Sequence, residues 1–93
     1  MFLHIIDVTY LSGYKLRLAF DNGSVKDVDL RDELLGEVFE PLKKITLFKK
    51  VTVNPNTKTI EWPNGADFAP EFLFEIGKEV NLKSKHKAIH TRV

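Results

Sequence analysis

Apolar and polar residues alternate over the first thirty positions of the chain, which predicts three short antiparallel strands. The turns between them lie at Leu11-Ser12-Gly13 and Asp21-Asn22-Gly23, and both end in glycine. A three-residue loop at each turn, with the glycine left-handed, sorts apolar residues onto one face and opposite charges onto the other. We therefore predict a three-stranded meander with Gly13 and Gly23 at positive φ.

The same reasoning fixes a register. It sets Arg17 opposite Asp27 on one side and opposite Asp7 on the other. The predicted core face comprises Ile6, Val8, Tyr10, Tyr14, Leu16, Leu18, Phe20, Val28 and Leu30. The opposite face, called the polar sheet face below, carries Asp7, Thr9, Lys15, Arg17, Asp27 and Asp29. We interpret it as a solvated surface with cross-strand ion pairs, and a polar binding face is the alternative.

The apolar period changes from two to three or four between residues 31 and 48, which is the spacing of a helical face. Gly36 and Pro41 interrupt it, so we expect short helical pieces rather than one long helix. The predicted buried positions are Leu34, Leu35, Val38, Phe39, Leu42, Ile45 and Phe48.

Alternation returns at residues 50–54 and 58–62, on either side of the turn Pro55-Asn56-Thr57. This pattern predicts a second hairpin. Its inward residues are Val51, Val53, Ile60 and Trp62. We expect Trp62 to be buried and to anchor the following turn to the last helix.

That helix is predicted to start near Pro70 and to end near Gly77. Its inward stripe comprises Phe72, Leu73, Ile76 and Val80. Phe74 lies about 200° from Phe72 and from Ile76 on the helical wheel, so one stripe cannot readily bury all three. Phe74 is therefore either a lone exposed residue or, with Phe68 or Val38, a contact for a second copy or another protein.

Together these elements predict an α+β fold over residues 1–80. An antiparallel sheet of about five strands, the meander plus the hairpin, packs with short helices and a C-terminal helix. Residues 81–93 are basic and without period, and we read them as a loose tail.

Composition narrows the classes of function. The 93 residues suit one domain, and the absence of cysteine excludes disulfide and thiolate chemistry and suits the cytoplasm. A net charge of +1 makes no electrostatic case for direct nucleic-acid binding. The N-terminal residues match neither a signal peptide nor a membrane span.

Candidate chemistry is sparse. His86 and His90 are four residues apart but lack a third metal ligand, and His4 is expected to be a hydrogen-bonded structural residue. The basic tail residues Lys83, Lys85, Lys87 and Arg92 lack interleaved aromatic residues for stacking on bases. No catalytic, cofactor-binding or metal-binding residues are predicted.

Carboxylates surround the Trp62 turn and the last helix, at Glu61, Asp67, Glu71 and Glu75. Acid pairs can perform general acid–base chemistry when their environments separate their pKa values. A simpler interpretation is that Asp67 accepts hydrogen bonds from the free amides at the helix start, while Glu71 favours the positive end of the helix dipole.

The stretch from Trp62 to Leu73, with Trp62, Gly65, Asp67, Pro70 and Glu71 as its marked positions, resembles the domain of unknown function 2442 family of small bacterial proteins. Further matches are Phe39-Glu40-Pro41-Leu42, Leu47-Phe48 and Val51-Thr52-Val53. The resemblance covers residues 2 to about 80. It implies a compact α+β domain with no established activity, and relatives include proteins with an appended DNA-binding domain and members of toxin–antitoxin-like pairs.

The sequence therefore favours a small bacterial accessory protein, antitoxin-like or regulatory, that acts by binding a protein partner or a second copy, and it favours a non-enzyme over an enzyme. The alternative is a small-molecule-binding or enzymatic domain with a site between the final helix and the sheet. An exposed apolar patch favours the first, and convergent ionisable groups in a cleft favour the second.

Overall fold

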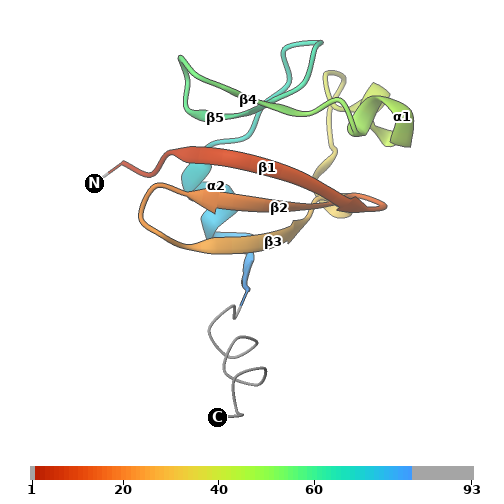
Figure 1. Ribbon diagram of the computed structural model, residues 1–93. Coiled ribbons are helices and arrows are strands. Elements are labelled where there is room, and N and C mark those ends of the chain that lie inside the picture. The colour runs from red at the N-terminus through yellow and green to blue at the C-terminus, as the bar shows by residue number, and fades with distance from the viewer. Residues whose placement is uncertain (1, 81–93) are drawn as a thin grey trace.

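A four-stranded antiparallel sheet forms the centre of the computed structural model, which describes residues 2–80 (Figure 1). Its strands are β1 (Ile5–Ser12), β2 (Lys15–Phe20), β3 (Val25–Asp29) and β6 (Lys78–Glu79), in the order β1-β2-β3-β6. Helix α2 (Pro70–Ile76) lies across one face of this sheet. The predictions for His86, His90 and the basic tail fall outside the described residues.

A separate two-stranded sheet, β4 (Thr52–Asn54) with β5 (Thr59–Glu61), lies beside β1. The α+β class is confirmed, but the single sheet of about five strands is replaced by two sheets. The hairpin is held to β1 by a hydrogen bond from the Ile5 amide to the Lys58 carbonyl, 2.9 Å long. Lys58 itself has a φ of +63°, because it closes a turn that is one residue longer than predicted.

The predicted register between β2 and β3 is confirmed. Arg17 lies opposite Asp27, and Lys15 lies opposite Asp29. The loop is the expected three residues, closed by the Phe20 amide on the Ser24 carbonyl at 2.8 Å. Gly23 takes a φ of +91°, which a residue with a side chain rarely adopts.

The predicted register between β1 and β2 is wrong by two residues. Thr9, not Asp7, lies opposite Arg17, and Asp7 lies opposite Ala19. The cause is the first turn, which holds only Gly13 and Tyr14 between the paired Ser12 and Lys15 instead of the predicted three residues Leu11-Ser12-Gly13. Bulges at Leu11 and Ile6 each absorb one extra residue of β1 and partly offset this difference. The bulge at Ile6 also turns this residue out of the core, leaving it 63% exposed. A shift of two residues preserves the faces, so Val8 and Tyr10 still lie on the core side.

Residues 31–48 form short helical pieces, as predicted. These are η1 (Arg31–Glu33), η2 (Glu40–Lys43) and α1 (Ile45–Phe48). Leu34, Leu42 and Phe48 are buried, but Leu35 and Val38 are 71% and 45% exposed. The predicted continuous stripe fails there because the chain turns at Gly36, which has a φ of +95°.

Helix α2 starts at Pro70 and ends before Gly77, as predicted, but Val80 is not on its stripe. The chain extends after Gly77 into β6, which pairs Lys78 with Asp27 and Glu79 with Lys26. The Val80 amide continues this pairing through a 2.9 Å hydrogen bond to the Val25 carbonyl. A two-residue strand carries no periodic signal, so the sequence pattern could not reveal it.

One hydrophobic core joins both sheets and α2. Its largest fully buried side chains are Trp62, Phe20, Phe48, Ile5, Leu16, Leu18, Leu30, Leu34, Ile60, Leu73 and Val28. Lys26 closes the core at the end of α2. Its ammonium donates to the Phe74 carbonyl at 2.7 Å and lies 3.6 Å from the centre of the Phe74 ring. A cation at this end satisfies an unpaired carbonyl and favours the negative end of the helix dipole.

Gly77 allows α2 and β3 to approach closely, and this predicts the effect of a methyl group. A Cβ at this position would lie 3.0 Å from the Leu73 carbonyl oxygen, the Lys26 Cβ and the Val28 Cγ1. We expect Gly77→Ala to lower the free energy of unfolding by about 1–3 kcal/mol, as overpacked sites do. Urea denaturation would measure this, with Glu75→Ala on the exposed side of α2 as the control. A Gly77→Ala protein as stable as wild type would contradict the close packing.

Candidate functional site

The turn from Trp62 to Ala66 is closed by its own backbone. The Trp62 amide donates to the Ala66 carbonyl at 2.9 Å, and the Gly65 amide donates to the Trp62 carbonyl at 2.9 Å. Gly65 takes a φ of +89°, which accounts for the glycine at this position. The turn therefore has a defined shape that does not depend on any bound group.

The side chain of Trp62 ties this turn to α1. The indole is 1% exposed, and its Nε1–H donates to the Phe48 carbonyl at 2.8 Å. Burial of Trp62 is confirmed, but the polar anchor reaches the end of α1 rather than α2. The contact toward α2 is apolar and runs through Phe68, whose ring centre is 6.0 Å from that of Trp62 and 5.7 Å from that of Phe72.

Asn64 makes a second link between the Trp62 turn and the helical segment of residues 38–50, and the line of contact between these two parts is called the seam below. Its Nδ2 donates to the Val38 carbonyl at 2.8 Å, while its Oδ1 accepts from the Ala66 amide at 3.1 Å. One side chain thus fixes the turn internally and joins it to the segment that precedes η2. Both the nitrogen and the oxygen of the side-chain amide are hydrogen-bonded, so the fold sets the position of the Asn64 side chain.

An apolar hollow lies along this seam. Its volume is about 180 Å³, and it is lined by Pro41, Leu42, Leu47, Lys50, Pro63 and Asn64. The Val38 carbonyl accepts a hydrogen bond from Asn64, one of the lining residues. Two prolines stiffen the walls, one in η2 and one in the turn.

A second, more polar hollow of about 430 Å³ adjoins the first. Its lining is Lys50, Thr52, Val53, Asn54, Pro55, Asn56, Glu61, Trp62 and Pro63. Lys50 and Pro63 line both hollows and so form the boundary between them. The two hollows together are called the seam groove below.

The dimensions of the apolar hollow suit one side chain rather than a drug-sized ligand. A cavity of about 150 Å³ lined by apolar residues accommodates a benzene-sized molecule, whereas small-molecule pockets usually measure about 300–1,000 Å³. The seam groove can therefore hold an apolar side chain in one part and polar groups in the other.

The predicted interaction residues do not form one patch. The Val38 carbonyl binds Asn64 in the wall of the seam groove, while the Phe68 ring packs against Trp62 and is stacked on Phe39 with ring centres 4.7 Å apart. Phe74 is half-buried against Phe20, with ring centres 5.2 Å apart, and is covered by Lys26. The helical-wheel analysis missed this partial burial because it considered only the inward side of α2. The residues that cover Phe74 are Phe20 in β2 and Lys26 in β3.

The expected cap of α2 by Asp67 is wrong. Ala69 occupies the N-cap position, and no side chain makes a capping hydrogen bond there. Asp67 instead forms a backbone bridge with Glu61, too far back in the chain to reach the first helical amides. Glu61 accepts a short hydrogen bond from the Asn54 side chain.

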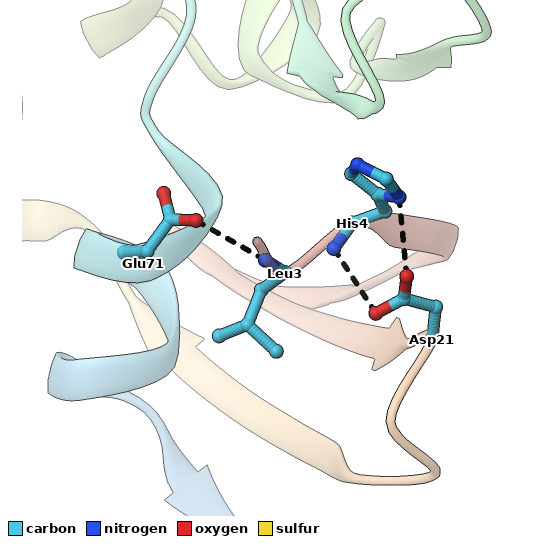
Figure 2. A network of polar contacts seen from close by, with 4 residues as sticks. All are labelled: Leu3, His4, Asp21 and Glu71. Atoms are coloured by element: carbon cyan, nitrogen blue, oxygen red, sulfur yellow. Dashed lines mark hydrogen bonds and ion pairs between the residues drawn. The ribbon is translucent and has the colours of Figure 1, made fainter. Parts of the chain in front are cut away.

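Glu71 lies in the first turn of α2, as predicted, and also binds the N-terminal segment (Figure 2). Its Oε2 accepts from the Leu3 amide at 3.2 Å. Asp21 binds His4 through both carboxylate oxygens. Oδ1 accepts from the His4 backbone amide at 3.1 Å, and Oδ2 lies 3.1 Å from the His4 Nδ1. His4 is thus a hydrogen-bonded structural residue, and this network fastens the start of the chain.

Among the described residues, the polar sheet face holds one ion pair, between Arg17 and Asp27. Thr9, Arg17, Asp27 and Lys78 lie in one row across the four strands, since directly opposite residues share a face. Arg17 donates to Asp27 through Nε at 2.8 Å and Nη2 at 3.0 Å. These bonds lower the pKa of the Asp27 carboxyl and raise the pKa of Arg17.

A polar hollow of about 320 Å³ lies where this face meets the end of α2. It is lined by Lys15, Asp27, Val28, Asp29, Ile76 and Lys78. Because Arg17 keeps Asp27 ionised, that carboxylate is poorly placed to act as a proton donor near neutral pH. Asp7, predicted to join this cluster, lies in the next row.

Within residues 2–80, no group of three or more His, Cys, Asp and Glu residues could hold a metal ion. In the same part of the chain, no helix has the length and apolar character needed to cross a membrane. Pattern reasoning missed the apolar hollow because its walls come from residues 41–50 and 63–64, which only the fold brings together. The available signal was that the family-like stretches include Pro41-Leu42, Leu47 and the Trp62 turn.

The fold and the Trp62 turn define a small α+β domain built around a tryptophan-anchored turn. The chain belongs to the family described as "Protein of unknown function (DUF2442)", whose model matches residues 5–79. No curated protein matches the chain.

A solved structure shares the fold. It is a crystal structure described as "Putative DNA Binding Protein" from Nitrosomonas europaea ATCC 19718, with a TM-score of 0.73 and 24% sequence identity. The match covers 84% of this chain and 50% of that chain, so the present chain spans about half the length of its neighbour.

Two variants separate the contribution of the Trp62 hydrogen bond to stability from the contribution of the buried aromatic ring. Trp62→Phe removes the donor and leaves the Phe48 carbonyl without its partner, which we expect to cost about 1–3 kcal/mol. Trp62→Ala should cost about 3–5 kcal/mol. Urea denaturation of both variants, with Phe2→Ala as an exposed aromatic control, gives the values. Equal stability of Trp62→Phe and wild type would refute the anchor.

The Arg17–Asp27 pair predicts a dependence of stability on pH. The folded-state pKa of Asp27 is lowered, so the pair stabilises the fold above the unfolded-state value of about 3.9 and loses this contribution as the pH falls through the folded-state pKa. We expect Asp27→Asn to be slightly less stable than wild type at neutral pH and equally stable in strong acid. The effect is small because both side chains are at least one-third exposed. Urea denaturation across this range tests it, and Asp32→Asn serves as the control.

Proposed function

We propose that this chain is a small bacterial accessory protein of the cytoplasm that acts by binding another protein through the seam groove. The observation that carries the proposal is the apolar hollow of about 180 Å³, whose walls are Pro41, Leu42 and Leu47 on one side and the Trp62 turn on the other. A concave apolar site of this size, next to exposed apolar residues, is typical of a contact that receives a side chain from a partner.

The surroundings of the hollow support this proposal. Val38, whose carbonyl is bound by the lining residue Asn64, exposes 45% of its surface. The walls are held by the Trp62 and Asn64 hydrogen bonds, so the site is largely formed before a partner arrives. A preformed site avoids part of the ordering cost of association.

A regulatory or antitoxin-like role is the finer part of the proposal. The resemblance to a family with such members supports it. The Nitrosomonas europaea neighbour is described as a "Putative DNA Binding Protein", and half of its length lies outside the match. In our proposal this domain does not contact nucleic acid directly, and it acts through its protein partner.

The second candidate is a small-molecule-binding or enzymatic domain, which the polar hollow beside α2 favours. Its volume of about 320 Å³ falls at the lower end of ligand pockets, and four ionisable residues line it. The bidentate tie between Arg17 and Asp27 weighs against acid–base catalysis there. A ligand of this hollow would lose affinity in Asp29→Asn and be unaffected by changes at Val38.

The proposed function is tested by comparing two exposed apolar residues. Val38→Glu places a charge in the segment that Asn64 joins to the seam groove, whereas Ile6→Glu places one on the bulge of β1. Tagged wild-type and variant proteins would be expressed in the native host, cross-linked and purified with their partners. We expect a stoichiometric partner with wild type and Ile6→Glu, and its loss with Val38→Glu.

Size-exclusion chromatography with light scattering would show whether that partner is a second copy of the chain. Thermal melts of both variants control for unfolding. Equal retention of the partner by Val38→Glu and Ile6→Glu, or the absence of any stoichiometric partner, would overturn the proposed function.

A further inference from the structure

The charge of the residues that line the seam groove limits which class of partner segment can bind there. This inference rests on the proposed function. Lys50 is exposed and lines both hollows, so a positive charge stands where the apolar part meets the polar part. No acidic residue lines the apolar hollow. Any segment that crosses the boundary between the two hollows must therefore pass Lys50.

The sequence around Lys50 strengthens the positive charge. Residues 43–50 contain four lysines and no acidic residue. The Lys43 ammonium lies 3.2 Å from Glu40, and the Lys49 ammonium lies 5.5 Å from the centre of the Tyr10 ring, so part of this charge has partners within the described chain. Lys50 and Lys44 form no ion pair with any residue in the range 2–80.

One acidic residue lines the groove. Glu61 lines the polar hollow, where its carboxylate accepts the Asn54 amide hydrogen bond, and it does not line the apolar hollow. The remaining polar lining includes threonine and asparagine side chains, which can hydrogen-bond an extended backbone. The groove thus combines an apolar hollow without acidic residues, a cation at its boundary and, beyond it, neutral polar groups with the single carboxylate of Glu61.

We infer that the occupant is an extended, acidic segment of a partner protein that inserts one large apolar side chain into the apolar hollow and places carboxylates beside Lys50. Charge complementarity selects an acidic partner over a basic one. The chain's own residues from Lys83 to Arg92 carry positive charge in sequence and do not meet this requirement. The apolar hollow has room for one side chain, so we expect a single apolar anchor. The adjoining polar hollow offers hydrogen-bonding side chains to a free backbone, which an extended segment has and a helix does not.

The test uses synthetic peptides and isotope-labelled protein. One peptide carries a central leucine flanked by aspartate and glutamate, a second replaces the leucine by serine, and a third replaces the acidic residues by lysine. Amide chemical shifts in two-dimensional NMR report where each peptide binds. We expect the acidic leucine peptide to shift residues 42–50 and Asn64 and to leave the polar sheet face unchanged.

Variants measure the two parts of the site. Lys50→Glu should weaken the acidic peptide by about fivefold or more, because it converts an attraction into a repulsion. Lys58→Glu is the matched control, an exposed lysine on the β4–β5 turn that lines neither hollow, and it should change little. Replacing the leucine by serine should weaken binding by about tenfold or more through lost apolar burial.

Several outcomes would overturn the inference. These are binding of the lysine peptide as tightly as the acidic one, equal effects of Lys50→Glu and Lys58→Glu, or no shift at millimolar acidic peptide. A DNA duplex that shifts residues 42–50 when the acidic peptide does not would identify a nucleic-acid surface instead. If the host partner is lost in Val38→Glu yet the acidic peptide fails, the proposed function stands and this inference falls.

Discussion

The hydrogen bond from the Trp62 indole to the Phe48 carbonyl is the interaction on which the rest of this structure depends. It is buried, and it joins the end of β5 to the end of α1, two segments that neither sheet connects. With the indole fixed, the turn that follows projects Pro63 and Asn64 toward η2. The seam groove is therefore a consequence of how the core closes, rather than a feature added to its surface.

The two faces of the molecule use charge differently. On the polar sheet face, Arg17 and Asp27 bind each other through two hydrogen bonds, and Lys78 continues the same row. A charged partner that competes for Arg17 or Asp27 would first have to separate this pair. At the seam groove, Lys50 has no such pair in the described part of the chain. Its charge is available to a partner without that cost.

The sequence predicted those parts of the fold in which short-range pairing and periodicity carry the information. The β2–β3 register followed from Arg17 and Asp27, and the ends of α2 followed from Pro70 and Gly77. The bulges of β1, the separate second sheet and β6 depend on long-range contacts, which leave no period in the sequence. Of the candidate site, Trp62 and Val38 were named in advance. Lys50 was not, because only the fold brings it beside Pro63.

Because its walls come from two distant segments, the seam groove couples binding to stability. A partner side chain in the apolar hollow would touch Leu42 and Leu47 on one side and Pro63 on the other, and so would add contacts across the seam that Trp62 holds. A partner that binds only the folded state raises the free energy of unfolding by mass action. A domain of this size has a small stability margin. Occupancy of the groove would thus also govern how much of the protein stays folded.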